Sequence, residues 1–237
     1  MAARGMGGGF ARRGGACAAL SLFASLGLVA CAEQEPAAQE PAVQQEPVVV
    51  TAVTDSADQE LLQEIYTQAF GRVGRAAEKG ALVADDERIT AVRNGQATVA
   101  FGCTGELLGL LDPQRAEQLS DEYVADDDPG KQYSAQWRDE VYVAMSESLP
   151  GELMATDPSN AQACTEVSGD NPGAELPQYL VPLYRIPALD RHERVEVLNR
   201  VAGSITTAEI AEMLERVEEG ESAGEVAGDW IATSRFS

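Results

Sequence analysis

The first thirty residues constrain this chain most, because they separate a leader from the part that has to fold. Arg4, Arg12 and Arg13 make the start positive, and residues 17–30 form an apolar run. A run this short does not span a bilayer as a stable helix, and a positive start followed by such a run is typical of a secretory signal peptide. The folded part is therefore expected in an extracytoplasmic compartment, where disulfides form.

The last residues of this leader, Leu28-Val29-Ala30-Cys31, resemble the lipobox at which bacterial lipoproteins are processed. In that family the Cys thiol is lipidated and the chain is cleaved before it. The resemblance implies a signal peptide over 1–30, a lipid anchor on Cys31 and attachment to the outer side of the bacterial cell membrane. The alternative is an ordinary secretory signal in which the Cys occurs by chance.

Residues 31–47 are rich in Glu, Pro and Gln, and Val43 is their one large apolar residue. Such a composition does not bury a core, so this stretch is predicted to be a disordered tether. Residues 48–237 are then predicted to form the folded α/β domain.

The composition and motifs exclude several classes of function. With 39 acidic against 17 basic residues and a formal net charge of −22, the chain repels the nucleic acid backbone. It shows no nucleophile paired with a base, no cluster of metal ligands and no phosphate loop with a lysine, so the prediction is no enzyme, no cofactor and no metal.

The cysteines predict one disulfide. Cys17 leaves with the leader and Cys31 is the lipidation site, so Cys103 and Cys164 remain as an even pair in an oxidising compartment. The alternatives are two free buried thiols or a two-ligand metal site. The metal site lacks partners, because His192 is the only histidine.

Two strand–turn–helix units are predicted in the first half of the folded part. The β-branched run 48–53 indicates a buried strand, and Ser56 with Gln59 forms a capping box for the helix that follows. A second strand over 97–101 leads through the turn 102–106 into another helix. Turns after neighbouring parallel strands meet at one edge of the sheet, where α/β proteins bind small ligands.

The second half is predicted to contain more helices and two strands. Helices are expected over 112–124, from Ser134 onward and throughout the last third, where Asp190 with Glu193 and Thr206 with Glu209 form capping boxes. Strands are expected over 152–156 and 179–186, the latter interrupted by Pro182 and so assigned to an edge or a bulge. Asp126–Asp128 indicate a turn rather than a calcium loop, and Trp137 and Met145 indicate core rather than a ligand site.

Three stretches together resemble the extracytoplasmic substrate-binding proteins of glycine betaine, choline, carnitine and proline ABC transporters. The stretches are residues 48–70, 93–105 and 186–231. The resemblance implies an α/β fold of the periplasmic-binding-protein type (type II), an ABC permease as partner and a small solute of the quaternary ammonium type as ligand.

The chain also departs from this family. Where members typically read Gly-Glu-Ile-Asp-Leu-Tyr-Pro-Glu-Tyr-Thr-Gly, the two tyrosines fall on Ala100 and Cys103. Aromatic rings attract a quaternary ammonium, so two rings that could hold one are missing. The stretch between Gly105 and Tyr179 is short for the family, which predicts a reduced second lobe within about residues 106–178.

The matched loops predict the ligand contacts. Ser56 and Thr104 are expected to bind the solute, with rings from Phe101, Tyr179 and Tyr184. The predicted function is that of a membrane-anchored extracytoplasmic solute-binding component of an ABC importer. The alternative is an envelope lipoprotein that has lost its cleft, binds a protein partner and carries no transported ligand.

Overall fold

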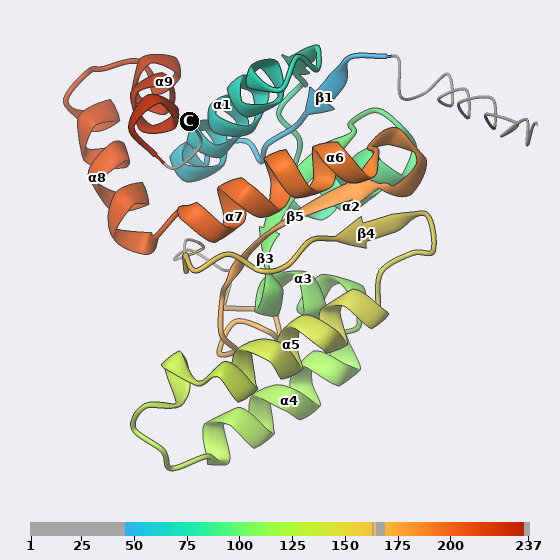
Figure 1. Ribbon diagram of the computed structural model, residues 1–237. Coiled ribbons are helices and arrows are strands. Elements are labelled where there is room, and N and C mark those ends of the chain that lie inside the picture. Colours follow the sequence, from blue (N-terminus) through green and yellow to red (C-terminus); the bar gives the residue numbers. More distant parts are fainter. Residues whose placement is uncertain (1–45, 163, 165–168, 235–237) are drawn as a thin grey trace, which may run out of the picture. The chain divides into compact units, whose positions relative to one another are not determined.

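The computed structural model describes residues 46–162, 164 and 169–234. The signal peptide, Cys31 and the tether up to residue 45 lie outside the described residues, so the predictions about them stay predictions. The folded part is built around one mixed sheet with helices on both faces (Figure 1).

The sheet has five strands in the order β2-β1-β3-β5-β4. β1 pairs in parallel with β2 and with β3, whereas β5 runs antiparallel to both β3 and β4. The strands are β1 (Val48–Val50), β2 (Ala77–Lys79), β3 (Val99–Cys103), β4 (Leu153–Ala155) and β5 (Leu180–Arg185).

Most helices occur where apolar periodicity and capping residues predict them, but α3 (Thr104–Leu111) already begins within the stretch 102–106 that was predicted to be a turn. Both capping boxes in the last third are formed: the Asp190 carboxylate accepts from Glu193 N at 2.7 Å, and Thr206 Oγ1 accepts from Glu209 N at 3.3 Å. The helices are α1 (Ala57–Arg72), η2 (Asp85–Glu87), α2 (Arg88–Arg93), α3 (Thr104–Leu111), α4 (Pro113–Ala125), η3 (Lys131–Tyr133), α5 (Ala135–Glu147), η4 (Ile186–Ala188), α6 (Arg191–Glu193), η5 (Arg194–Asn199), α7 (Arg200–Ser204), α8 (Thr207–Glu218) and α9 (Ala223–Thr233).

Strand β5 separates two hydrophobic cores, because alternate side chains of a strand point to opposite faces of the sheet. Leu180 and Tyr184 belong to the core that α1 and the C-terminal helices cover. Val181 and Leu183 belong to the core of α3, α4 and α5, which pack together on the other side of the strand (Figure 1).

The second core confirms two predictions about α4 and α5. Trp137 and Met145 are buried core residues, and the Trp137 ring packs edge-on against Tyr123 at 5.1 Å. Asp126 lies in the turn after α4 and accepts a hydrogen bond from Trp137 Nε1 at 2.7 Å. The Asp126 carboxylate therefore fastens the turn to α5, and this bond holds its pKa below the usual range.

The assignment of the Pro182 strand to an edge is wrong. β5 has neighbours on both sides, with Pro182 paired to Phe101 of β3. Thr156 N donates to the Pro182 carbonyl at 3.3 Å, and proline has no N–H to return. Because β4 ends at Ala155, the proline removes a hydrogen bond only where that ladder is already ending.

The structure also corrects the sequence reading of α1 and adds a strand. Ser56 precedes the helix as predicted, but its hydroxyl donates to the Asp58 carboxylate and makes no capping bond. Strand β2 was not predicted, because three residues of the sequence Ala-Glu-Lys carry no apolar run and pair only along the outer side of β1.

Cys103 and Cys164 form the predicted disulfide, which closes a loop with a sequence separation of 61 residues. Replacing both (Cys103→Ser with Cys164→Ser) is expected to lower the free energy of unfolding by about 4 kcal/mol, since the unfolded chain gains the entropy of the open loop. Urea unfolding of the full chain measures this loss.

The matched control for this prediction is Cys31→Ser, which leaves the disulfide intact and should not change the urea midpoint. A double variant as stable as the parent chain would contradict the role assigned to the disulfide.

Candidate functional site

Three segments of the chain follow or flank the parallel strands β1 and β3. The two strands are neighbours, with Val50 opposite Val99, and each leads directly toward the start of a helix. Thr54 N donates to Val83 O at 2.9 Å, which places the segment entering η2 alongside. We call this region, residues 54–59, 85–88 and 103–106, the carboxyl edge.

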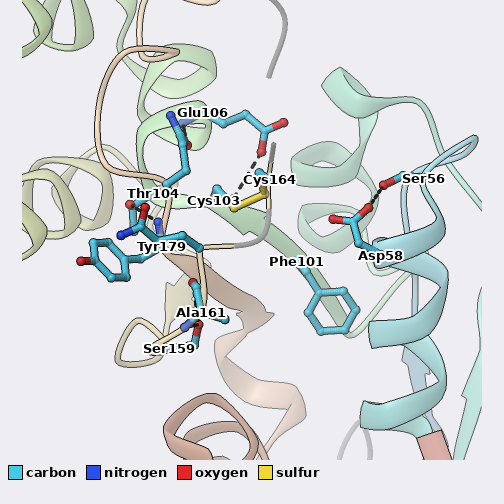
Figure 2. Close-up of a disulfide and its surroundings, with 12 residues drawn as sticks. Ser56, Asp58, Phe101, Cys103, Thr104, Glu106, Ser159, Ala161, Cys164 and Tyr179 are labelled. Atoms are coloured by element: carbon cyan, nitrogen blue, oxygen red, sulfur yellow. Dashed lines mark hydrogen bonds between the residues drawn. A yellow bond between two sulfur atoms is a disulfide. The ribbon is translucent and has the colours of Figure 1, made fainter. Parts of the chain in front are cut away.

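The chain turns sharply from β1 into α1. Asp55 has a φ of 59°, a left-handed conformation that Asp tolerates better than most residues. Ser56 is partly exposed, and its hydroxyl bonds Asp58 within the first turn of α1 (Figure 2). The start of α1 thus combines free backbone N–H groups with two carboxylates, a mixture suited to a dipolar solute.

Gln59 carries the one unusual polar group of this helix start. Its side chain is 3 % exposed, and within the described part of the chain its Oε1 atom has no hydrogen-bond partner. Buried amide oxygens are nearly always paired, because an unpaired one costs about 1–3 kcal/mol.

A buried guanidinium joins the other two segments of the carboxyl edge. Arg88 is 1 % exposed; its Nη1 donates to Phe101 O at 2.9 Å, and its Nη2 binds Glu106 Oε1 at 2.7 Å and also the Asp85 carboxylate. Glu106 Oε2 in turn accepts from Cys103 N at 3.3 Å. A buried charge has to be paired in this way, so Arg88 fixes the first turn of α3 against α2.

Burial raises the pKa of the Asp85 carboxyl above its ordinary value. Arg88 acts in the opposite direction, but the nearby Glu106 carboxylate adds to the rise. Two carboxylates thus share one guanidinium, and the protonated form of Asp85 is favoured in the folded chain relative to the unfolded one.

Two of the predicted contact residues lie together where α3 begins. Thr104 is fully buried; its Oγ1 donates to Pro177 O at 2.8 Å and accepts from Tyr179 N at 3.2 Å (Figure 2). Tyr179 is 8 % exposed and its hydroxyl donates to Gln132 O at 3.4 Å. The Thr104 hydroxyl therefore ties the start of α3 to the segment entering β5.

The other two predicted rings lie in the first core. Phe101 is fully buried and stacks on Tyr66 with ring centroids 4.7 Å apart. Tyr184 is 2 % exposed, and the Arg194 guanidinium lies over its ring at 5.9 Å and donates to its hydroxyl at 3.2 Å. The structure does not bring these rings to the surface beside Ser56.

Gln59, Arg88 and Glu106 were not among the residues predicted for the site. The sequence indicates Gln59 only as the partner of Ser56 in a capping box, and its burial is seen only in the folded chain. Arg88 follows three acidic residues, and such a run of charged residues is typical of a solvent-exposed segment. Only the folded chain brings it against Glu106.

The described residues contain no group of His, Cys, Asp and Glu side chains suited to a metal ion. Among the helices of the described ranges, none combines the length and the apolar character needed to cross a bilayer.

Residues 151–233 match a family model described as the substrate binding domain of an ABC-type glycine betaine transport system. This stretch contains β4, β5 and the helices that follow. The family model describes a binding domain, which agrees with the prediction that the chain is not an enzyme.

Two solved structures share the fold. Apo YehZ from Escherichia coli has a TM-score of 0.58 and 12 % identity, and the match covers 81 % of this chain and all of the other. The crystal structure of a glycine betaine/carnitine/choline ABC transporter has a TM-score of 0.53 and 10 % identity. That match covers 78 % of this chain and 97 % of the other. No curated protein sequence matches the chain. The predicted periplasmic-binding-protein fold is confirmed.

The raised pKa of Asp85 makes stability depend on pH. Because the folded chain holds this proton more tightly than the unfolded chain, ionised Asp85 costs stability as the pH rises above the ordinary pKa of 3.8. Asp85→Asn is therefore expected to gain stability relative to the parent chain on going from about pH 4 to about pH 7.

Urea unfolding at several pH values measures this difference, with the exposed Asp139→Asn as the matched control. If the difference in unfolding free energy between Asp85→Asn and the parent chain stayed constant with pH, or changed in the opposite direction, the pKa of Asp85 would not be raised in the folded chain.

Proposed function

We propose that this protein is the solute-binding component of an ABC importer and that the carboxyl edge binds its solute. The observation that carries the proposal is Gln59, a buried side chain with an unpaired acceptor in the first turn of α1. A buried acceptor without a partner at the start of a helix costs stability unless a ligand donates a hydrogen bond to it.

The chemistry of the edge favours a small dipolar or cationic solute. Asp55 and Asp58 give it negative charge, as does the one charge of Asp85 and Glu106 that Arg88 does not offset, while the first N–H groups of α1 can bind a carboxylate. Carnitine and proline carry a cationic nitrogen, a carboxylate and an O–H or N–H donor for Gln59 Oε1, whereas glycine betaine has no such donor. The likeness to binding proteins for this solute class supports the proposal.

The mechanism is capture between the two cores. The α3–α5 core is joined to the rest of the domain through β3, β4 and β5, and a solute at the carboxyl edge would contact α1 on one side and the start of α3 on the other. A ligand that contacts both sides stabilises the conformation in which they are close.

The lipid on Cys31 would hold the domain on the outer surface of the membrane, with residues 32–47 as a tether. From there the protein would deliver its solute to an ABC permease, and Ser56 would contribute to the ligand contacts.

A specific observation favours the second candidate function, an envelope lipoprotein without a transported ligand. Thr104, Phe101 and Tyr184 are buried and already engaged with other groups of the protein. In that case the fold is kept for binding a protein partner.

A thermal-shift screen of the full chain separates the two functions. Glycine betaine, choline, carnitine or proline at 100 times its dissociation constant should add about 2.7 kcal/mol of stability, or about 5–10 °C in Tm. No shift with any solute, for a chain that melts cooperatively, would favour the second function.

Gln59→Leu tests the site itself. The variant removes the unpaired oxygen without changing the size of the side chain greatly, so it should melt at or above the temperature of the parent chain. Its affinity for a solute with an O–H or N–H donor, such as carnitine or proline, should fall about tenfold by calorimetry, the loss of one hydrogen bond to a polar ligand.

Gln118→Ala, an exposed substitution on α4, is the control and should change neither value. Unchanged affinity in Gln59→Leu would remove Gln59 from the site.

A further inference from the structure

A pocket lies next to the carboxyl edge, between the loop after β2 and α2, and it shares Glu87 with that edge but not Gln59. Its volume is about 330 Å³, at the lower end of the range for small-molecule sites. We call it the α2 pocket. It is lined by Thr51, Ala81, Val83, Glu87, Thr90, Ala91, Gln96 and Ala97.

The walls of the α2 pocket are fixed by backbone hydrogen bonds. The loop after β2 is fastened to the sheet, since Gly80 N donates to Val50 O at 2.7 Å and Val83 N donates to Ala52 O at 3.0 Å. On the opposite wall, Ala91 O accepts from the backbone N–H groups of Gln96 at 2.9 Å and Ala97 at 3.1 Å. The pocket is therefore preformed, which lowers the cost of binding.

The floor of the pocket is apolar and its rim carries hydrogen-bond acceptors. Ala91 and Ala97 are almost completely buried and leave room above them. Glu87, the last residue of η2, caps the start of α2 one turn before Thr90, and Gln96 follows the helix. Among the described residues these three exposed side chains make no hydrogen bond or ion pair.

We propose that the α2 pocket binds a small cation that carries N–H groups and a short apolar body, such as a primary ammonium or a guanidinium compound. The Glu87 carboxylate accepts charge-assisted hydrogen bonds from such a group, and Thr90 and Gln96 offer further acceptors. The alanine floor covers the methylene groups.

The same chemistry disfavours a quaternary ammonium in this pocket. Such a cation has no N–H to donate and is held instead by aromatic faces, and no aromatic ring lines the α2 pocket. The α2 pocket thus differs in ligand class from the solute proposed for the carboxyl edge, and the inference does not rest on that function.

Titration of the full, ¹⁵N-labelled chain with propylammonium chloride tests the proposal by NMR. The amide signals of Ala91, Gln96 and Ala97 should shift and saturate, whereas tetramethylammonium and propionate should leave them in place. Glu87→Gln should weaken propylammonium binding about tenfold, the effect of losing the charge on the acceptor. Asp86→Asn, which changes the neighbouring carboxylate outside the pocket, should bind as the parent chain does.

Three results would overturn the proposal: shifts at these amides that do not saturate, equal binding of tetramethylammonium, or equal propylammonium binding by Glu87→Gln. Thr90→Val serves as a second variant with a weaker expected loss, so the test does not depend on one substitution. Gln59→Leu should leave propylammonium binding unchanged, which separates this pocket from the carboxyl edge.

Discussion

The pairing of β5 with β3 is the interaction on which the rest of the structure depends. Its antiparallel register runs from Val99 opposite Tyr184 to Cys103 opposite Leu180. It therefore sets the start of α3 beside the segment that enters β5, where Thr104 bonds Pro177 and Tyr179. Because successive side chains of β5 face opposite sides, the same strand completes the core of α1 and that of α3–α5, and a site can form between them.

The parts of the fold that the sequence predicts are those with a local physical cause. The β-branched start of β1, the capping boxes at Asp190 and Thr206 and the even pair of cysteines are signals within a few residues or a simple count. Strand β2 and the inner position of Pro182 depend on neighbours far along the chain. A strand of three residues exists only because β1 pairs with it, and a proline is tolerated between two strands only because β4 ends beside it.

The candidate site is predicted only in part, for a reason that lies in the sheet. β3 is buried on both faces, so its sequence shows no alternation of apolar and polar residues, and nothing local indicates which way Phe101 points. The structure turns that ring toward Tyr66 in the core. Arg88 likewise has its ion-pair partner Glu106 eighteen residues away, on another helix. The position of Ser56 at the start of α1, in contrast, follows from its own turn.

The central claim is that the carboxyl edge holds a small solute between the two cores, and a crystal structure of the full chain grown with saturating carnitine, whose hydroxyl can donate to Gln59 Oε1, tests it most directly. The account predicts ligand density in contact with Gln59 and the first turn of α1, facing the segment from Cys103 to Glu106. Ligand bound elsewhere, or an empty edge in crystals grown with ligand that is shown by calorimetry to bind, would contradict it.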